Sequence, residues 1–270
     1  MMELTRRGSI GLNIVVTLLY LFLLAPIIIV VIAAFNSGEY LKFPPEGFSL
    51  RWFRALLSSE PFIDAFLFSL RLALIVTALA TVIGTAAALY VTRYSRRFRG
   101  LIQLMMISPL PVPAILTGIA LLIFFYATDI STNSFVNLTI GHTIVTIPYV
   151  FLTVSTVLVG FNRSLEEAAR SLGAGPWTTF RRITLPILKS GIVSGAVFAF
   201  IISFDQFPIS LLLAGVGSTP LPVQLFDYLR FSFDPTAAAV STVTIVMTVI
   251  VVLITERLVG LDSLYARGKS

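Results

Sequence analysis

The chain has 270 residues, of which 57% are hydrophobic and 12% charged, and its mean hydropathy is +0.95. Soluble domains are about 45–50% apolar and about 25% charged, so this composition excludes a water-soluble domain and indicates an integral membrane protein. The lack of cysteine excludes disulfides and thiol chemistry. The net charge of +6 does not indicate nucleic-acid binding, because most basic residues lie in short segments between apolar stretches, where they set topology.

Six apolar stretches are long enough to form transmembrane helices, which need about 20 residues. They are Leu12–Phe35, Phe66–Thr92, Leu101–Ala127, Phe135–Phe161, Ile187–Leu213 and Ala237–Val259. The first is too long for a signal-peptide core, so we expect it to be retained as a span. The sequence therefore predicts an all-α membrane protein with a first span and external loop at 1–64, a core at 65–260 and a cytoplasmic tail at 261–270.

The distribution of lysine and arginine predicts the orientation. Of 19 such residues, 14 fall on one side of the six spans. Two precede span one, four lie between spans two and three, five lie between spans four and five, and three follow span six. Because cytoplasmic loops are enriched in these residues, we expect both termini in the cytoplasm of a bacterium, with the chain in its inner membrane.

The segment between spans four and five is polar and predicts a short helix on the cytoplasmic side. Ser164 and Glu167 have the spacing of a capping box. One helix face would hold Leu165, Ala168, Ala169 and Leu172, and the other Glu166, Glu167 and Arg170. We expect Gly173 to end this helix, and Pro176 and Pro186 to begin the next helical turns. From periodicity alone, the segment is either a docking site for a partner or an amphipathic helix resting on the bilayer.

The pattern of this segment is more specific than its periodicity. Glu167-Ala168-Ala169, three residues, Gly173, nine residues and Ile183-Thr184-Leu185-Pro186 resemble the signature loop of permease subunits of type I ABC importers. The resemblance covers about residues 65–260 and includes Ser69–Ala73, Gly84–Tyr90 and Ser108–Pro113.

The resemblance implies that this loop forms a coupling helix that docks in a groove of a separate ATPase. The implied ATPase-coupling residues are Glu166, Glu167, Ala168, Ala169, Leu172, Gly173 and Ala174. The sequence has no G-x-x-x-x-G-K-[ST] loop, so the partner ATPase would bind ATP and Mg, and this chain would be a translocation subunit rather than an enzyme. The implied complex contains a homologous permease, forming a heterodimer with this chain, two ATPase subunits and a soluble substrate-binding protein.

Within that family the chain is most similar to the second permease of spermidine/putrescine-type transporters. The similarity lies in Ser203-Phe204-Asp205-Gln206-Phe207, where those transporters typically have two successive aspartates. The resemblance implies a polyamine or similar small organic amine as substrate. Gln206 replaces the second acid, and losing one carboxylate weakens the case for a polycation, so another small organic solute is the alternative.

Asp205 is the strongest candidate for a residue that lines the substrate pathway, because an ionisable group at membrane depth usually faces a cavity or a partner. Phe204 and Phe207 beside it would offer ring faces to a cation. The alternative is structural, with Asp205 capping a helix break near Pro208. His142, the only histidine, is expected to be a hydrogen-bonded interfacial residue rather than a metal ligand, and we expect no metal site.

Two other classes of protein are alternatives to an importer. An ion-driven secondary transporter would need several ionisable groups within its spans and often shows internal repeats, whereas here only Asp205 and Arg71 qualify and no repeat is visible. A membrane assembly protein without a transport role would leave the signature loop unexplained. The loop pattern also favours an importer over an ABC exporter.

Overall fold

The computed structural model describes residues 6–93, 97–128 and 133–259, and the predicted tail at 261–270 lies outside them. The helices are α1 (Arg6–Ala34), α2 (Arg51–Leu57), α3 (Glu60–Arg93), α4 (Arg99–Ile107), α5 (Ala114–Thr128), α6 (Ser134–Val159), α7 (Ser164–Ser171), α8 (Pro176–Thr179), the π-helical turn η1 (Phe180–Thr184), α9 (Leu185–Phe204), α10 (Phe207–Leu213), α11 (Leu221–Leu229) and α12 (Thr236–Val259). In these ranges, the one β pairing is an isolated bridge between Asn36 and Phe48. The predicted all-helical membrane fold is confirmed, with five helices of spanning length and the shorter apolar helix α5.

Two predicted spans are not single helices. The stretch predicted as span three, Leu101–Ala127, is divided into α4 and α5, because the prolines at 109, 111 and 113 interrupt the backbone hydrogen-bond ladder. The stretch predicted as span five, Ile187–Leu213, is divided at Asp205 and Gln206 into α9 and α10.

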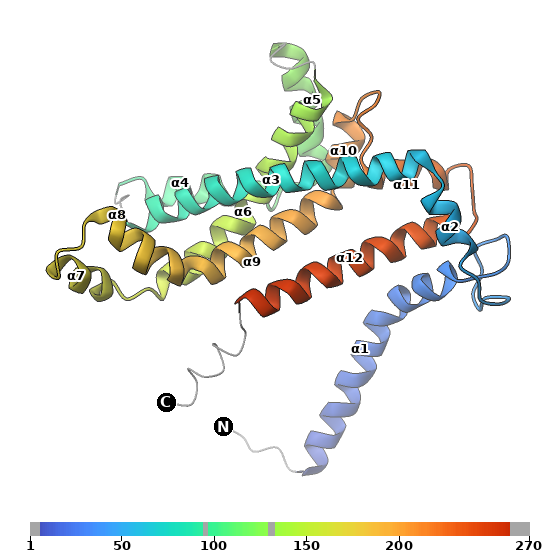
Figure 1. Cartoon of the computed structure of the whole chain (residues 1–270), viewed down its shortest axis with the longest axis horizontal. Helices are drawn as coiled ribbons and strands as arrows, with labels where there is room; N and C mark the ends of the chain where they lie inside the picture. Colours follow the sequence, from blue (N-terminus) through green and yellow to red (C-terminus); the bar gives the residue numbers. More distant parts are fainter. Residues whose placement is uncertain (1–5, 94–96, 129–132, 260–270) are drawn as a thin grey trace. The chain divides into compact units, whose positions relative to one another are not determined.

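The described chain forms two compact units, and the larger holds Asp64–Gln224 and the end of α12 from Thr248. Inside it, α6 and α9 pack side by side (Figure 1). The close approach depends on Gly191 and Gly195 of α9, since a Cβ at Gly191 would lie 2.9 Å from the Thr153 carbonyl oxygen and one at Gly195 would lie 2.8 Å from the Cα of Val150.

The core of this unit lies along α6. Buried side chains of α6 meet α3 and α9, and α10 contacts both α5 and α6. The principal members are Ala80, Ala88 and Val91 of α3, Val150, Phe151, Val154 and Leu158 of α6, and Leu188 and Ala199 of α9. Because α7, α8 and η1 connect α6 to α9, this packing places the polar segment at one end of the helix pair.

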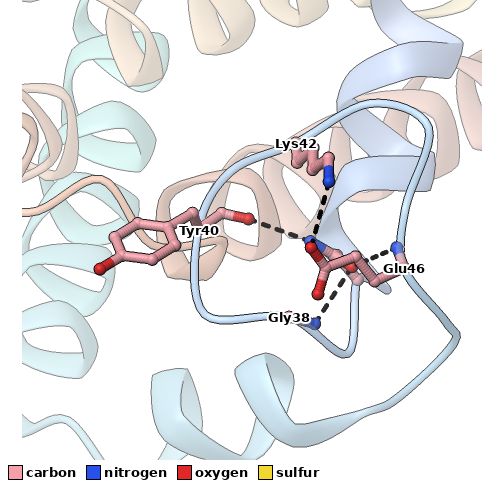
Figure 2. A network of polar contacts seen from close by, with 5 residues as sticks. Gly38, Tyr40, Lys42 and Glu46 are labelled. Atoms are coloured by element: carbon pink, nitrogen blue, oxygen red, sulfur yellow. Dashed lines mark hydrogen bonds and ion pairs between the residues drawn. The ribbon is translucent and has the colours of Figure 1, made fainter.

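The smaller unit holds α1, α2 and the start of α12. Asn36 orders the loop after α1, because its Oδ1 accepts hydrogen bonds from the amides of Gly38 and Glu46 and its Nδ2 donates to the Tyr40 carbonyl. Lys42 pairs with Glu46 at 3.2 Å, and the Tyr40 ring points away from this network (Figure 2).

Asp234 joins α11 to α12 in the same unit. Its Oδ1 accepts from the Thr236 amide at 2.8 Å, which caps the N-terminus of α12, and its Oδ2 accepts from the Tyr228 hydroxyl at 2.5 Å. Burial, together with this bond to a carboxylate, raises the pKa of Tyr228.

Candidate functional site

The coupling segment, residues 162–186, begins with an Asx cap rather than the predicted capping box. The Asn162 Oδ1 accepts from the Ser164 amide at 3.0 Å, and α7 includes Ser164 as its first residue. The side chain of Arg163, the residue before the helix, forms no capping hydrogen bond. The capping-box prediction for Ser164 and Glu167 is therefore wrong, because Asn162 already performs the local capping two residues earlier.

The end of α7 matches the sequence prediction. Gly173 has φ +85°, its amide donates to the Arg170 carbonyl at 2.9 Å, and the Ala174 amide donates to the Ala169 carbonyl at 3.0 Å. This pair of bonds defines a Schellman motif, which requires a left-handed residue at the position of Gly173. The motif turns the chain sharply toward α8, whose first residues include Pro176 as predicted.

Glu166 anchors this segment to the rest of its unit. Its side chain is 10% exposed, its Oε1 lies 2.7 Å from the Arg93 Nη2 at the end of α3, and the Thr184 hydroxyl of η1 donates to the same oxygen. The Arg93 guanidinium also lies over the ring of Phe161 at 5.3 Å. One buried carboxylate therefore joins α7 to α3 and to the start of α9.

The segment exposes several large apolar side chains. Leu165 is 47% exposed, Leu172 89% and Trp177 71%, and Trp177 stacks on Phe180 at 5.7 Å. Glu167 and Ala168 are exposed as well, while Ala169 and Ala174 are half-buried. Glu166 is therefore buried within the chain, whereas Glu167 and the two leucines remain exposed.

The second candidate site is the break between α9 and α10. Asp205 ends α9 and is exposed, whereas Gln206 is 9% exposed and precedes α10, which carries Pro208 in its first turn. Phe204 is 3% exposed, with its ring stacked on Phe200 at 6.0 Å and edge-on to Phe66 at 5.7 Å. Phe207 is half-buried in the first turn of α10.

His142 of α6 lies behind this break. It is 1% exposed, with Nδ1 3.0 Å from the Ser203 Oγ and Nε2 3.0 Å from the Ser210 Oγ. The prediction of a fully hydrogen-bonded histidine is confirmed, but its environment is a buried core rather than an interface.

Sequence reasoning missed the roles of four residues in these sites. Arg93 was interpreted only as a topology signal, Thr184 and Ser203 lay in the quoted motifs without a role of their own, and Ser210 belonged to no motif. A seven-residue spacing of serines across a predicted helix break was the one available signal for the pair.

Comparison with known proteins identifies the class to which this arrangement belongs. Residues 80–261 match the family described as binding-protein-dependent transport system inner membrane component, and the chain belongs to it. It is a multi-pass permease subunit of an ATP-driven, binding-protein-dependent importer, in which a separate ATPase binds ATP and a binding protein delivers the substrate.

Its relatives include named polyamine permeases. The chain is 34% identical to a putrescine transport system permease of Escherichia coli K12, over 85% of this chain and 84% of that protein. It is 32% identical to a spermidine/putrescine transport system permease of Haemophilus influenzae, over 88% of this chain and 91% of that protein.

Solved structures show the same fold. A bacterial ABC transporter that imports the acidic polysaccharide alginate aligns with a TM-score of 0.68 and 16% identity, over 96% of this chain and 98% of that one. The MetNI methionine ABC transporter, in an inward-facing conformation, aligns with a TM-score of 0.62 and 20% identity, over 74% of this chain and 97% of that one.

Proposed function

We propose that this permease forms half of the pathway of an importer for polyamines or similar small organic amines, paired with a homologous second permease. The names of the relatives support this substrate class, since they include putrescine and spermidine/putrescine permeases. Asp205 supports it chemically, because an exposed carboxylate at a helix break can pair with a substrate ammonium group.

The loss of the second acid at Gln206 is compatible with an amine substrate, because this position is buried. In spermidine/putrescine-type transporters a second aspartate typically stands at this position. Here the side chain is 9% exposed, and a carboxylate so buried would lose its hydration without a cationic partner. Replacement by glutamine therefore leaves the exposed carboxylate of Asp205 unchanged on the pathway.

The coupling segment is proposed as the ATPase docking surface. The exposed apolar side chains of Leu165, Leu172 and Trp177 would enter a groove of the ATPase, with Glu167 pairing with a basic group there. Small side chains at Ala168 and Gly173 permit close approach, while Glu166 holds the segment to this chain. When ATP closes the ATPase pair, the segment would move as a body and carry α3 and α9 with it.

The proposed topology has six spans and both termini in the cytoplasm. In this arrangement α4 and α5 together replace one continuous span, and the coupling segment lies between spans four and five. The domain division stays as proposed from the sequence, with a first span and external loop at 1–64, a core at 65–260 and a tail at 261–270.

A second substrate is favoured by one relative. A putative 2-aminoethylphosphonate transport system permease of Salmonella paratyphi A is 25% identical over 93% of this chain and 95% of that protein. Its named solute shares a primary amine with the polyamines but also carries a phosphonate. A carboxylate at Asp205 suits the shared ammonium group and would repel the phosphonate.

The test is transport by the whole importer, purified through a tag on this chain. Mass spectrometry should find an ATPase, a second six-span permease and a binding protein. After reconstitution, we expect uptake of labelled putrescine or spermidine that excess 2-aminoethylphosphonate does not inhibit. Asp205→Asn should lower the substrate imported per ATP hydrolysed by roughly tenfold, the effect of losing a charged hydrogen bond. Uptake of the phosphonate alone, or an unchanged ratio in the variant, would contradict the proposal.

A further inference from the structure

The break between α9 and α10 is held from behind by a single side chain. Ser203 lies in the last turn of α9 and Ser210 in the first turn of α10, and both hydroxyls are within hydrogen-bond distance of His142 on α6, at 3.0 Å each. The two serines are 2% and 0% exposed, so no water competes for these bonds.

The direction of these hydrogen bonds follows from the bond that Ser210 makes to the backbone. The Ser210 hydroxyl donates to the Gln206 carbonyl, which lies in the break itself. With its proton used there, the Ser210 Oγ can only accept from His142, so Nε2 carries a hydrogen. A connected series of bonds thus runs from His142 through Ser210 to the backbone beside Asp205.

Close packing leaves this region little room to adjust. A Cβ at Gly141 would lie 2.9 Å from the Ile209 Cγ2, and one at Gly118 of α5 would lie 3.4 Å from the Ile209 Cα. Packing fixes how far α10 stands from α5 and α6, but apolar contacts do not specify the backbone direction at Asp205. The hydrogen bonds of His142 supply that direction.

We propose that His142 is a positioning residue for the substrate pathway, which bridges α9 and α10 through Ser203 and Ser210 and thereby fixes the place of the Asp205 carboxylate. This inference rests on the proposed pathway role of Asp205. His142 itself is buried and does not touch the substrate.

Two substitutions at His142 distinguish its bond to Ser203 from its bond to Ser210. In His142→Gln the side-chain amide reaches the position of Nε2 and can still donate to Ser210. In His142→Asn the amide reaches only the position of Nδ1, so the link to Ser210 and the break is lost. Ser210→Ala removes the same link from the other side, and Ser210→Thr restores the hydroxyl as its matched control.

The experiment measures labelled putrescine imported per ATP hydrolysed by the reconstituted importer, with its binding protein at saturation. We expect His142→Asn and Ser210→Ala to lower this ratio by roughly tenfold, the factor for a lost hydrogen bond of good strength, while binding-protein-stimulated ATPase activity persists. We expect His142→Gln and Ser210→Thr to stay within roughly twofold of the wild type. A purely structural role would instead lower ATPase activity and import together and leave the ratio constant.

The double variant His142→Asn, Asp205→Asn identifies the route of the effect. If His142 acts through Asp205, the double variant transports as Asp205→Asn does; independent, multiplying losses would overturn the inference. Wild-type ratios in both His142→Asn and Ser210→Ala, with Asp205→Asn impaired, would overturn the inference alone. A wild-type ratio in Asp205→Asn would instead overturn the proposed pathway. If His142→Asn does not assemble with the ATPase, Ser210→Ala decides by the same criteria.

Discussion

Glu166 and Glu167 are adjacent residues whose side chains lie in opposite environments. Successive residues on an α-helix are turned by about 100°, so only one of the two can face α3. Glu166 faces it and shares a 2.7 Å ion pair with Arg93, in which the two side chains are 10% and 16% exposed. A buried pair is costly to break, because the remaining charge stays desolvated. Glu167 is exposed and free to meet a partner.

The first prediction contrasts these two residues. Glu166→Gln should lower the free energy of unfolding by about 3 kcal/mol, because it leaves the largely desolvated Arg93 guanidinium without a countercharge. Glu167→Gln should change it by less than about 0.5 kcal/mol, as is usual for an exposed site. Denaturation of the purified chain in detergent measures both values.

The same variants should separate folding from docking. Glu167→Gln should reduce co-purification of the ATPase although the chain is as stable as the wild type. Equal destabilisation by the two substitutions would contradict the assignment of Glu166 as the internal anchor.

The roles of these residues were only partly predictable from the sequence. Periodicity grouped Glu166, Glu167 and Arg170 on one face of α7 and did not distinguish the two glutamates. It could not distinguish them because the partner of Glu166, Arg93, comes from α3, 73 residues before Glu166. Conversely, the turn at Gly173 was predictable, because a left-handed residue at a helix end is a local requirement.

At the scale of elements, the coupling segment is a rigid corner built from two short helices. The Schellman motif at Gly173 sets the angle between α7 and α8, and the stacked pair of Trp177 and Phe180 continues into η1. An angle set by one residue is sensitive to substitution there. A Cβ at Gly173 would meet no atom within 4 Å, so its cost comes from the φ of +85° alone.

The second prediction uses this separation of backbone strain from packing. Gly173→Ala should destabilise the corner by about 1 kcal/mol, because alanine is strained in the left-handed region. Gly173→Asn should be milder, since asparagine tolerates that region. Gly175→Ala is the matched control, because Gly175 also has open space around it but an ordinary φ of −68°.

The measurement is ATPase activity stimulated by the loaded binding protein in the assembled importer. Activity should fall in the order Gly175→Ala, Gly173→Asn, Gly173→Ala. If the two alanine variants behaved alike, the conformation of Gly173 would not govern coupling.

Helix breaks were the least predictable elements. The apolar run at Leu101–Ala127 looked like one span because hydropathy averages over its prolines, which in the structure separate α4 from α5. The sequence did hold a signal for the second break, in the polar Asp205 and Gln206 before Pro208, but not for the histidine that supports it.

At the scale of the whole molecule, charge asymmetry is the strongest argument for orientation. In the topology predicted from the sequence, 14 of the 19 lysines and arginines lie on the side that carries the coupling segment. That side must be cytoplasmic if an ATPase docks there, so the charge distribution and the coupling proposal predict the same orientation. The proposed outer side carries the loop after α10, where the side chain of Val216 is fully exposed.

The last prediction tests this orientation directly. The chain has no cysteine, so a single introduced thiol is the only one that a maleimide can label. Val216→Cys should react with a membrane-impermeant maleimide in cells whose outer membrane is permeabilised and whose inner membrane is intact. Thr178→Cys in α8 should react only after the inner membrane is lysed. Both positions are exposed in the structure, so a difference between them reports sidedness rather than burial. Expression without the ATPase keeps α8 uncovered. Labelling of Thr178→Cys in intact cells would place the coupling segment outside, where no ATPase could dock, and both the topology and the coupling proposal would then be wrong together.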